Sequence, residues 1–183
     1  MIFQSLSSKI SEYEALQRYL SENGQASYEA FLHETFSKYL LISCASMFED
    51  TVQDLISDFI AEHTDSEMVQ SLVKNKVIKR QYHTFFKWDG KNANSFYGLF
   101  GDKFSKRIQE KLKNNDALKD GEEAFLAIGE ARNQLVHDNF SGYELDKNID
   151  DIITLFKQAC TYIDFLKEEL IPPKFPNDVL RNF

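Results

Sequence analysis

Hydrophobic residues recur at steps of three and four along most of the chain, the spacing of amphipathic helices. The first such stretch ends at the sequence ENGQAS, which contains a Gly and several small polar residues. The hydrophobic positions of this stretch are Ile2, Phe3, Leu6, Ile10 and Tyr13. The next stretch, from residue 28 to about residue 62, contains neither Gly nor Pro. It predicts one long helix, or two helices joined by a slight bend near residues 43–46.

The middle of the chain is less regular. Residues 67–86 (EMVQSLVKNKVIKRQYHTFF) predict another helix with a basic outer face. Residues 87–104 predict a loop with short helical pieces, because Gly90, Gly98 and Gly101 interrupt the pattern. Asp102 is expected to cap a further helix that ends near Leu112.

Two more helices are predicted in the last third. Residues 114–121 (NNDALKDG) indicate a linker, and Asp120 followed by Glu123 resembles a capping box that opens a helix from about Glu122 to His137. After a loop over residues 138–148, Asn148 is expected to cap the last helix together with Asp151. Three prolines then end the periodic pattern, so residues 171–183 predict an extended tail: Pro172, Pro173 and Pro176.

These elements predict an all-α fold in a single domain over residues 1–183. The expected architecture is a bundle of four main helices, with residues 65–120 as a helical insert between the second and third core helices. Only 7 Gly and 3 Pro occur in 183 residues, which agrees with helices rather than with strands and tight turns.

The composition indicates a cytoplasmic protein. The chain has no apolar run of about 18 residues, as a membrane span requires, and its N-terminal sequence lacks the pattern of a secretory leader. Cys44 and Cys160 both fall in apolar helical patterns without CxxC spacing. Two buried free thiols are therefore expected, rather than a disulfide or a metal site.

The charge of −8 is unevenly distributed. Residues 74–113 carry eleven basic and three acidic side chains, a net charge of +8, which leaves −16 on the rest of the chain. This basic stretch is either a solvated face that balances the acidic remainder or a path for RNA. In the second case its basic side chains would contact phosphates; the candidates are Lys79, Arg80 and Lys87.

Aromatic side chains in the same stretch have two interpretations. Tyr82, Phe85, Phe86 or Trp88 could stack on a base. Such residues are more often part of a hydrophobic core.

The stretch IGEARNQLVHDNF (residues 128–140) places polar side chains among apolar ones at the end of a predicted helix. Arg132 and His137 are separated by about 140° of rotation and about 7.5 Å of rise, whereas Asn133 and His137 share a face. One interpretation is a helix C-terminus that carries cations favoured by the helix dipole. The other is a site that handles phosphate.

These residue types are sufficient for RNA cleavage without a metal. The 2′-OH must lose a proton as it attacks the adjacent phosphorus, and the leaving 5′-oxygen must gain one. Histidine can donate or accept a proton near neutral pH, and the planar guanidinium of arginine matches the oxygens of a pentacoordinate phosphorane. We therefore assign proton transfer to His137, charge stabilisation to Arg132, and an orienting or oxygen-binding role to Asn133.

The remaining chemistry-bearing residues indicate no further site. His33, His63 and His83 have no ligand spacing with cysteines or carboxylates and are interpreted as ordinary histidines. The chain has no P-loop, HExxH or GxSxG motif. No cofactor or metal is expected.

The motif RNQLVH resembles the R-x4–6-H signature of the HEPN superfamily, whose Arg is commonly followed by Asn, Asp or His. The sequences FEDTVQDLI and FFKWDG…NSFYGLFG resemble the RiboL-PSP-type and related MAE-type members. The resemblance implies a homodimeric, metal-independent endoribonuclease, often a toxin or anti-phage effector that is sometimes restrained by an antitoxin or another partner protein. Two copies of Arg132 and His137 would then share one cleft. It also implies a polar or acidic residue on the long helix, for which Glu49 is our candidate.

Two hypotheses follow. The first is an RNase that leaves 2′,3′-cyclic phosphate ends. The second is a HEPN-like interaction module that binds a nucleotide or a partner protein without cleavage. A growth assay on induction distinguishes them, because an unrestrained RNase is expected to be toxic.

Overall fold

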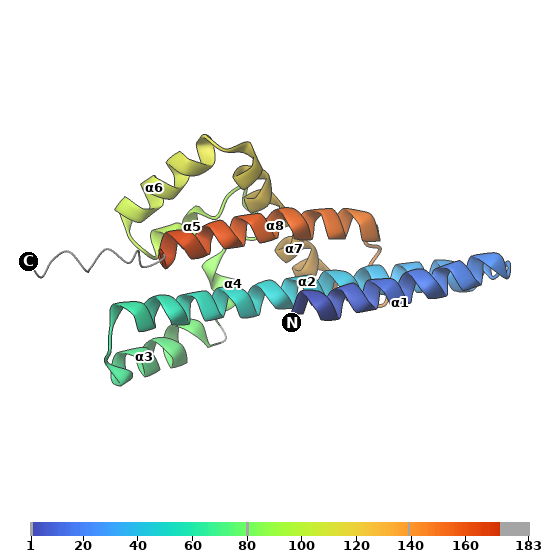
Figure 1. The fold of residues 1–183 in the computed structure, drawn as a ribbon, viewed down its shortest axis with the longest axis horizontal. Helices are drawn as coiled ribbons and strands as arrows, with labels where there is room; N and C mark the ends of the chain where they lie inside the picture. Colours follow the sequence, from blue (N-terminus) through green and yellow to red (C-terminus); the bar gives the residue numbers. More distant parts are fainter. Residues whose placement is uncertain (1, 80, 139, 173–183) are drawn as a thin grey trace, which may run out of the picture.

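The computed structural model describes residues 2–79, 81–138 and 140–172, and these contain helices and loops but no strand (Figure 1). The all-α prediction is confirmed. The helices are α1 (Ile2–Glu22), α2 (Ala26–His63), α3 (Glu67–Val73), the π-helical turn η1 (Lys74–Ile78), α4 (Tyr82–Phe85), α5 (Asn94–Gly98), α6 (Asp102–Lys113), α7 (Asp116–His137) and α8 (Ile149–Leu170).

Helices α1 and α2 form an antiparallel pair (Figure 1). The turn between them uses Gly24 at φ 65°, in the left-handed region that favours glycine. Helix α2 is a single helix of 38 residues, about 57 Å long, so of the two possibilities from the sequence the uninterrupted helix is found. This length lets α2 contact α1 with its first half and α7 and α8 with its middle.

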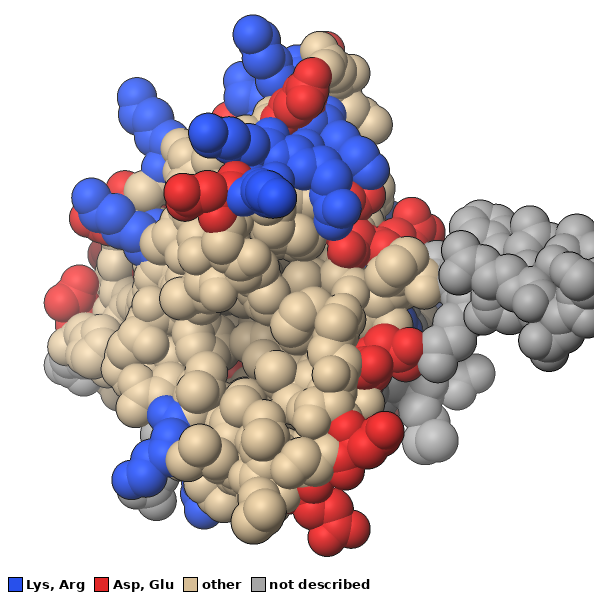
Figure 2. All heavy atoms as spheres, turned by 90° about the vertical axis from the view of Figure 1, so that its left-hand side faces the viewer, with Lys and Arg blue, Asp and Glu red and all other residues tan. Residues whose placement is uncertain are grey.

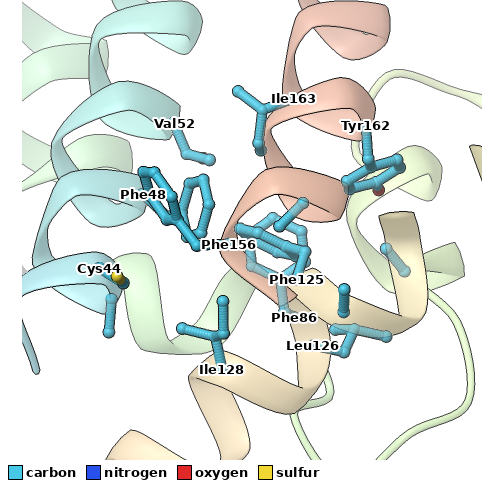
Figure 3. Packing of buried hydrophobic residues seen from close by; sticks show 14 of the residues in the cluster. Cys44, Phe48, Val52, Phe86, Phe125, Leu126, Ile128, Phe156, Tyr162 and Ile163 are labelled. Carbon is cyan, nitrogen blue, oxygen red and sulfur yellow. The ribbon is translucent and has the colours of Figure 1, made fainter. Parts of the chain in front are cut away.

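The core lies between α2, α7 and α8 (Figure 3). Phe48 of α2 lies 5.5 Å from the Phe125 ring of α7 and 5.2 Å from the Phe156 ring of α8, centroid to centroid. Helices α7 and α8 can approach closely because Gly121 has no side chain: a Cβ there would lie 2.6 Å from the Gln158 carbonyl oxygen. The inner helices therefore form a tightly packed unit.

Residues 65–120 contribute directly to this core. Phe86 lies among the α2, α7 and α8 side chains in Figure 3, 4.9 Å from Phe125. Phe96 and Tyr97 of α5 are fully buried. Tyr97 donates a hydrogen bond to the buried carboxylate of Glu122 (2.5 Å), and its oxygen lies 2.6 Å from the hydroxyl oxygen of Tyr162. The segment is therefore held to α7 and α8 by aromatic packing and by a buried polar network.

The prediction of one helix over residues 67–86 is wrong. The chain forms the short helix α3, the turn η1 and the four-residue α4, and neither Lys79 nor Gln81 between η1 and α4 is helical. Ile78, Phe85 and Phe86 are buried, whereas Met68 and Leu72 are exposed. A straight helix would keep these positions in one register, so the break is what turns the aromatic pair into the core.

The predicted start of the motif helix is also wrong. Helix α7 begins at Asp116 rather than near Glu122, and its N-cap is Asn115, whose side chain accepts a hydrogen bond from the Leu118 backbone. Gly121 lies inside the helix because it meets α8 there, and Glu122 is buried instead of exposed at a cap.

The two other predicted caps differ in outcome. Helix α6 begins at Asp102, but its N-cap is Gly101 at φ 91°, without a side-chain capping bond, so the prediction for Asp102 is wrong. The capping box of Asn148 and Asp151 is confirmed at the start of α8. Helix α8 ends at Leu170, and most of the predicted tail lies outside the described residues.

The two cysteines are free thiols, as expected. Cys44 of α2 is buried in the core, whereas Cys160 of α8 is only partly buried, so the expected burial is found for Cys44 alone. Burial raises the pKa of Cys44 to about 12 and that of Cys160 to about 11.

Candidate functional site

The polar residues of the motif, Arg132, Asn133 and His137, line one pocket. Its volume is about 620 Å³, large enough for a nucleotide and the adjoining phosphate by comparison with typical ligand pockets of about 300–1,000 Å³. Four elements supply its walls, and the lining residues are Ala45 and Glu49 of α2, Tyr82 and His83 of α4, Trp88, and Gly129, Arg132, Asn133 and His137 of α7.

Helix α7 presents two different faces. Residues 129, 132, 133 and 137 lie within an arc of about 140° on the helix surface, which is the arc that lines the pocket. Ile128, Ala131 and Leu135 are buried on the core side. Arg132 and His137 thus lie at the two edges of one polar face and need not superpose to reach a common pocket. This arrangement explains why polar residues stand among apolar ones in this stretch.

The Arg132 guanidinium is held by its neighbour. Arg132 Nη1 donates a hydrogen bond to Asn133 Oδ1 at 3.1 Å. This contact differs from both roles considered for Asn133 from the sequence, because the amide orients Arg132 rather than His137 or a phosphate oxygen. Asn133 and Arg132 are partly buried, and His137 is exposed at the end of the helix.

The opposite wall carries the candidate acidic residue. Glu49 lines the pocket from α2, and its Oε1 accepts a hydrogen bond from Gln53 Nε2 at 3.2 Å. Burial raises the pKa of Tyr82, with a further increase from Glu49 and an opposing decrease from Arg132. Tyr82 therefore lies within electrostatic range of both groups and keeps its proton, so it can donate a hydrogen bond or stack but not act as a base.

Trp88 joins the α4 segment to α7. Its ring lies on Gly129, where an added Cβ would come within 2.1 Å of two ring carbons. Its Nε1 donates a hydrogen bond to the His83 carbonyl oxygen at 3.2 Å. Trp88 on Gly129, together with Phe86 on Phe125, thus holds the segment that carries Tyr82 and His83 against the motif helix.

Two of the four aromatic residues of this segment belong to the core, and the other two line the pocket. Phe85 and Phe86 are buried core residues. Tyr82 and Trp88 are partly exposed in the pocket wall, 5.3 Å apart between ring centroids.

The basic stretch does not remain continuous on the surface. Lys79 and Lys87 are exposed on either side of α4 but are not among the pocket-lining residues, and Arg80 lies outside the described residues. Figure 2 shows one group of Lys and Arg side chains at the top, where α6 lies, separated by an uncharged area from basic side chains at the bottom, where α3 lies. In the α6 group, Arg107 and Lys111 both form ion pairs with Glu169 of α8. Part of the basic charge therefore holds the insert to the bundle.

His83 lines the pocket, although the sequence pattern indicated an ordinary histidine. It lies 54 residues before His137 in the chain, and no spacing rule connects the two. Tertiary packing, of Trp88 on Gly129 and of Phe86 on Phe125, brings its segment to the motif helix.

Within the ranges that the structure describes, no group of three or more His, Cys, Asp and Glu side chains could hold a metal ion. None of the described helices is long and apolar enough to cross a membrane.

Helical packing and the R-x4-H face of α7 are the features of a HEPN domain, a nuclease-like, RNA-related class that includes RNases and whose members often bind RNA and dimerise. A family model described as RiboL-PSP-HEPN matches residues 4–171, and the chain belongs to this family. The resemblance to the RiboL-PSP type is thereby confirmed. Comparison with curated proteins and with solved structures found no match for this chain.

Proposed function

We propose that this protein is a metal-independent endoribonuclease of the toxin or anti-phage defence type. The observation that supports the proposal is the shared pocket: Arg132, whose guanidinium donates a hydrogen bond to Asn133, and His137 line the same volume. These are the two groups that phosphate-directed cleavage requires, one that is always cationic and one that exchanges protons.

The reaction begins with attack of the ribose 2′-oxygen on the adjacent phosphorus. A base removes the 2′-OH proton, Arg132 stabilises the negative charge of the phosphorane, and an acid protonates the 5′-oxygen as the P–O5′ bond breaks. The products are a 2′,3′-cyclic phosphate and a 5′-hydroxyl. His137 performs one of the two proton transfers.

Two features favour action as a homodimer with RNA in a shared cleft. HEPN domains often dimerise. Exposed apolar side chains also lie beside the motif, with Val136 49% exposed and Phe140 47% exposed. A second copy of the chain would cover these residues and bring its own Arg132 and His137 to the cleft. Lys79, Arg80 and Lys87 are the proposed contacts to the RNA backbone.

The test is cleavage of total RNA and tRNA by purified protein in EDTA. Replacing His137 with Ala is expected to lower kcat/KM about 10²–10⁴-fold, the contribution of a proton-transfer group. Replacing Arg132 with Ala is expected to lower it about 10²–10³-fold, the effect of losing one charge-stabilising donor. His63→Ala on α2 and Arg18→Ala on α1 are the matched controls, since both side chains are exposed and outside the pocket.

Two results would refute the proposal: absence of cleavage by the wild-type protein under all conditions, or equal cleavage by the wild type and both pocket variants. Binding of nucleotide or of a partner protein without cleavage would instead support the second hypothesis, a non-catalytic HEPN module. Harmless expression in a host would agree with that outcome.

A further inference from the structure

Two of the four histidines of the chain, His83 and His137, line the same pocket. The other two are engaged elsewhere. His33 Nδ1 lies 2.9 Å from the Tyr13 hydroxyl, and His63 Nδ1 lies 2.8 Å from the Phe59 carbonyl oxygen. In contrast, neither the His83 nor the His137 imidazole forms a hydrogen bond with another residue that the structure describes. Both rings are therefore available to a ligand in the pocket.

His83 is positioned by the surrounding packing. Its helix α4 is short, but Phe85 at the end of the helix and Phe86 directly after it are 5% and 4% exposed, and they anchor the segment in the core. On the pocket side, the Trp88 indole binds the His83 carbonyl and rests on Gly129, one helical turn before Asn133. The backbone of His83 is thus tied to the helix that carries the motif.

We propose that His83 is the second proton-transfer group of the site, so that one protomer holds both the base and the acid for RNA cleavage. This inference rests on the proposed RNase function. It makes a second copy of His137 unnecessary for the chemistry, although a second copy can still shape the cleft.

The two imidazoles divide the reaction between them. The neutral imidazole takes the proton from the ribose 2′-OH as the O2′–P bond forms. The protonated imidazole delivers its proton to O5′ as the P–O5′ bond breaks, and the pair has then exchanged protonation states. The charged and titratable groups that face His83 across the pocket are Glu49 of α2 and Arg132 and His137 of α7, with Tyr82 beside it on α4.

A pair of this kind has a bell-shaped dependence of kcat/KM on pH, because one group must be neutral and the other protonated. A histidine with a purely structural role would change the rate without removing either limb of the bell.

The experiment measures pH–rate profiles for the wild type, His83→Ala, His83→Gln and His137→Ala with a short RNA in EDTA. His83→Gln keeps a polar side chain that cannot transfer protons, and His63→Ala is the matched control. We expect both His83 variants to lose about 10²–10⁴-fold in kcat/KM and to retain only one limb of the profile. The emission of the single tryptophan, Trp88, verifies that the pocket of each variant is intact.

A second substrate assigns the roles. RNA with sulfur in place of the bridging 5′-oxygen has a leaving group that needs no protonation. The variant that lacks the acid is expected to recover most of its rate on this substrate, and the variant that lacks the base is not.

The outcomes separate the two proposals. If His137→Ala loses activity but the His83 variants cleave within about twofold of wild type, or keep both limbs of the profile at a lower rate, the role of His83 is refuted and the RNase stands. If the wild type cleaves no RNA, both proposals fail.

Discussion

The contact between Trp88 and Gly129 provides a sharp test of how the pocket is built. Replacing Gly129 with Ala adds a Cβ at 2.1 Å from Cε3 and Cζ3 of the Trp88 ring. Carbon atoms in good contact are about 3.5–4.0 Å apart, so the ring must move by about 1.4 Å or more. Such a movement would stretch the 3.2 Å bond from Trp88 Nε1 to the His83 carbonyl beyond hydrogen-bond distance.

The expected loss of stability can be estimated from these effects. Overpacking costs about 1–3 kcal/mol, and loss of the hydrogen bond adds about 1 kcal/mol. The better helix propensity of Ala offsets about 1 kcal/mol. The free energy of unfolding should therefore fall by about 2 kcal/mol, which lowers Tm by about 4–8 °C for a chain of this size.

Trp88 is the only tryptophan of the chain, so its emission reports the displacement directly. Gly129→Ala is expected to shift the emission to longer wavelength as the ring becomes more exposed, in parallel with the loss of stability in urea. RNA cleavage, if the proposed function holds, should fall at least about tenfold, because small misplacements of reactive groups cost up to about 10²-fold. Gly98→Ala is the matched control, since no atom lies within 4 Å of a Cβ added there.

Wild-type emission and stability in Gly129→Ala would refute this packing of Trp88 on Gly129. Such a result would mean that the ring does not rest on the glycine and that Trp88 does not hold His83 beside the motif.

Three further predictions concern the fold. Replacing Tyr97 with Phe removes a hydrogen bond that lowers the pKa of Glu122, which burial raises above 4.5, so the native state binds the Glu122 proton more tightly than the unfolded chain does. This contribution to stability is present below about pH 4.5 and is lost as pH rises through the native pKa. The free energy of unfolding of the variant, measured in urea, should fall by about 1–3 kcal/mol, and by more at about pH 7 than at about pH 4. An equal fall at both pH values would contradict this prediction. Asn148→Ala should lower the free energy of unfolding by about 1 kcal/mol, because it removes the capping box of α8. Thr154→Ala on the exposed side of α8 is the control, and an unchanged Tm of Asn148→Ala would contradict this prediction. Iodoacetamide should modify Cys160 slowly at neutral pH and Cys44 only on unfolding, because burial raises the pKa of Cys160 to about 11 and that of Cys44 to about 12. Early labelling of Cys44 in mass spectra would contradict this prediction and show that the core opens.

Several elements were predictable from the sequence because their causes are local. The absence of Gly and Pro from residues 28 to 62 permits one long helix. Asn148 and Asp151, three residues apart, form a capping box that sets the start of α8. Arg132, Asn133 and His137 were also grouped from the sequence, by their side-chain chemistry and by the resemblance to the HEPN signature, and all three line one pocket.

Other features could not be predicted, because a neighbour far along the chain overrides the local signal. Gly121 is typical of a helix end, yet it lies within α7 because Tyr162 and Gln158 of α8 need the space. The basic stretch is continuous in the sequence but divided on the surface, since η1 packs on α2 while α6 packs near α7.

By itself, the sequence determined the helical class, the long helix, the cap of α8 and the polar face of α7, since periodicity and capping depend on residues within a turn or two of each other. Only the tertiary structure decided what faces that polar surface. Trp88 packs on Gly129 across about forty residues of chain, and this contact encloses the pocket and brings His83 to it. Such a contact depends on how the whole core is filled, and no local pattern of residues encodes it.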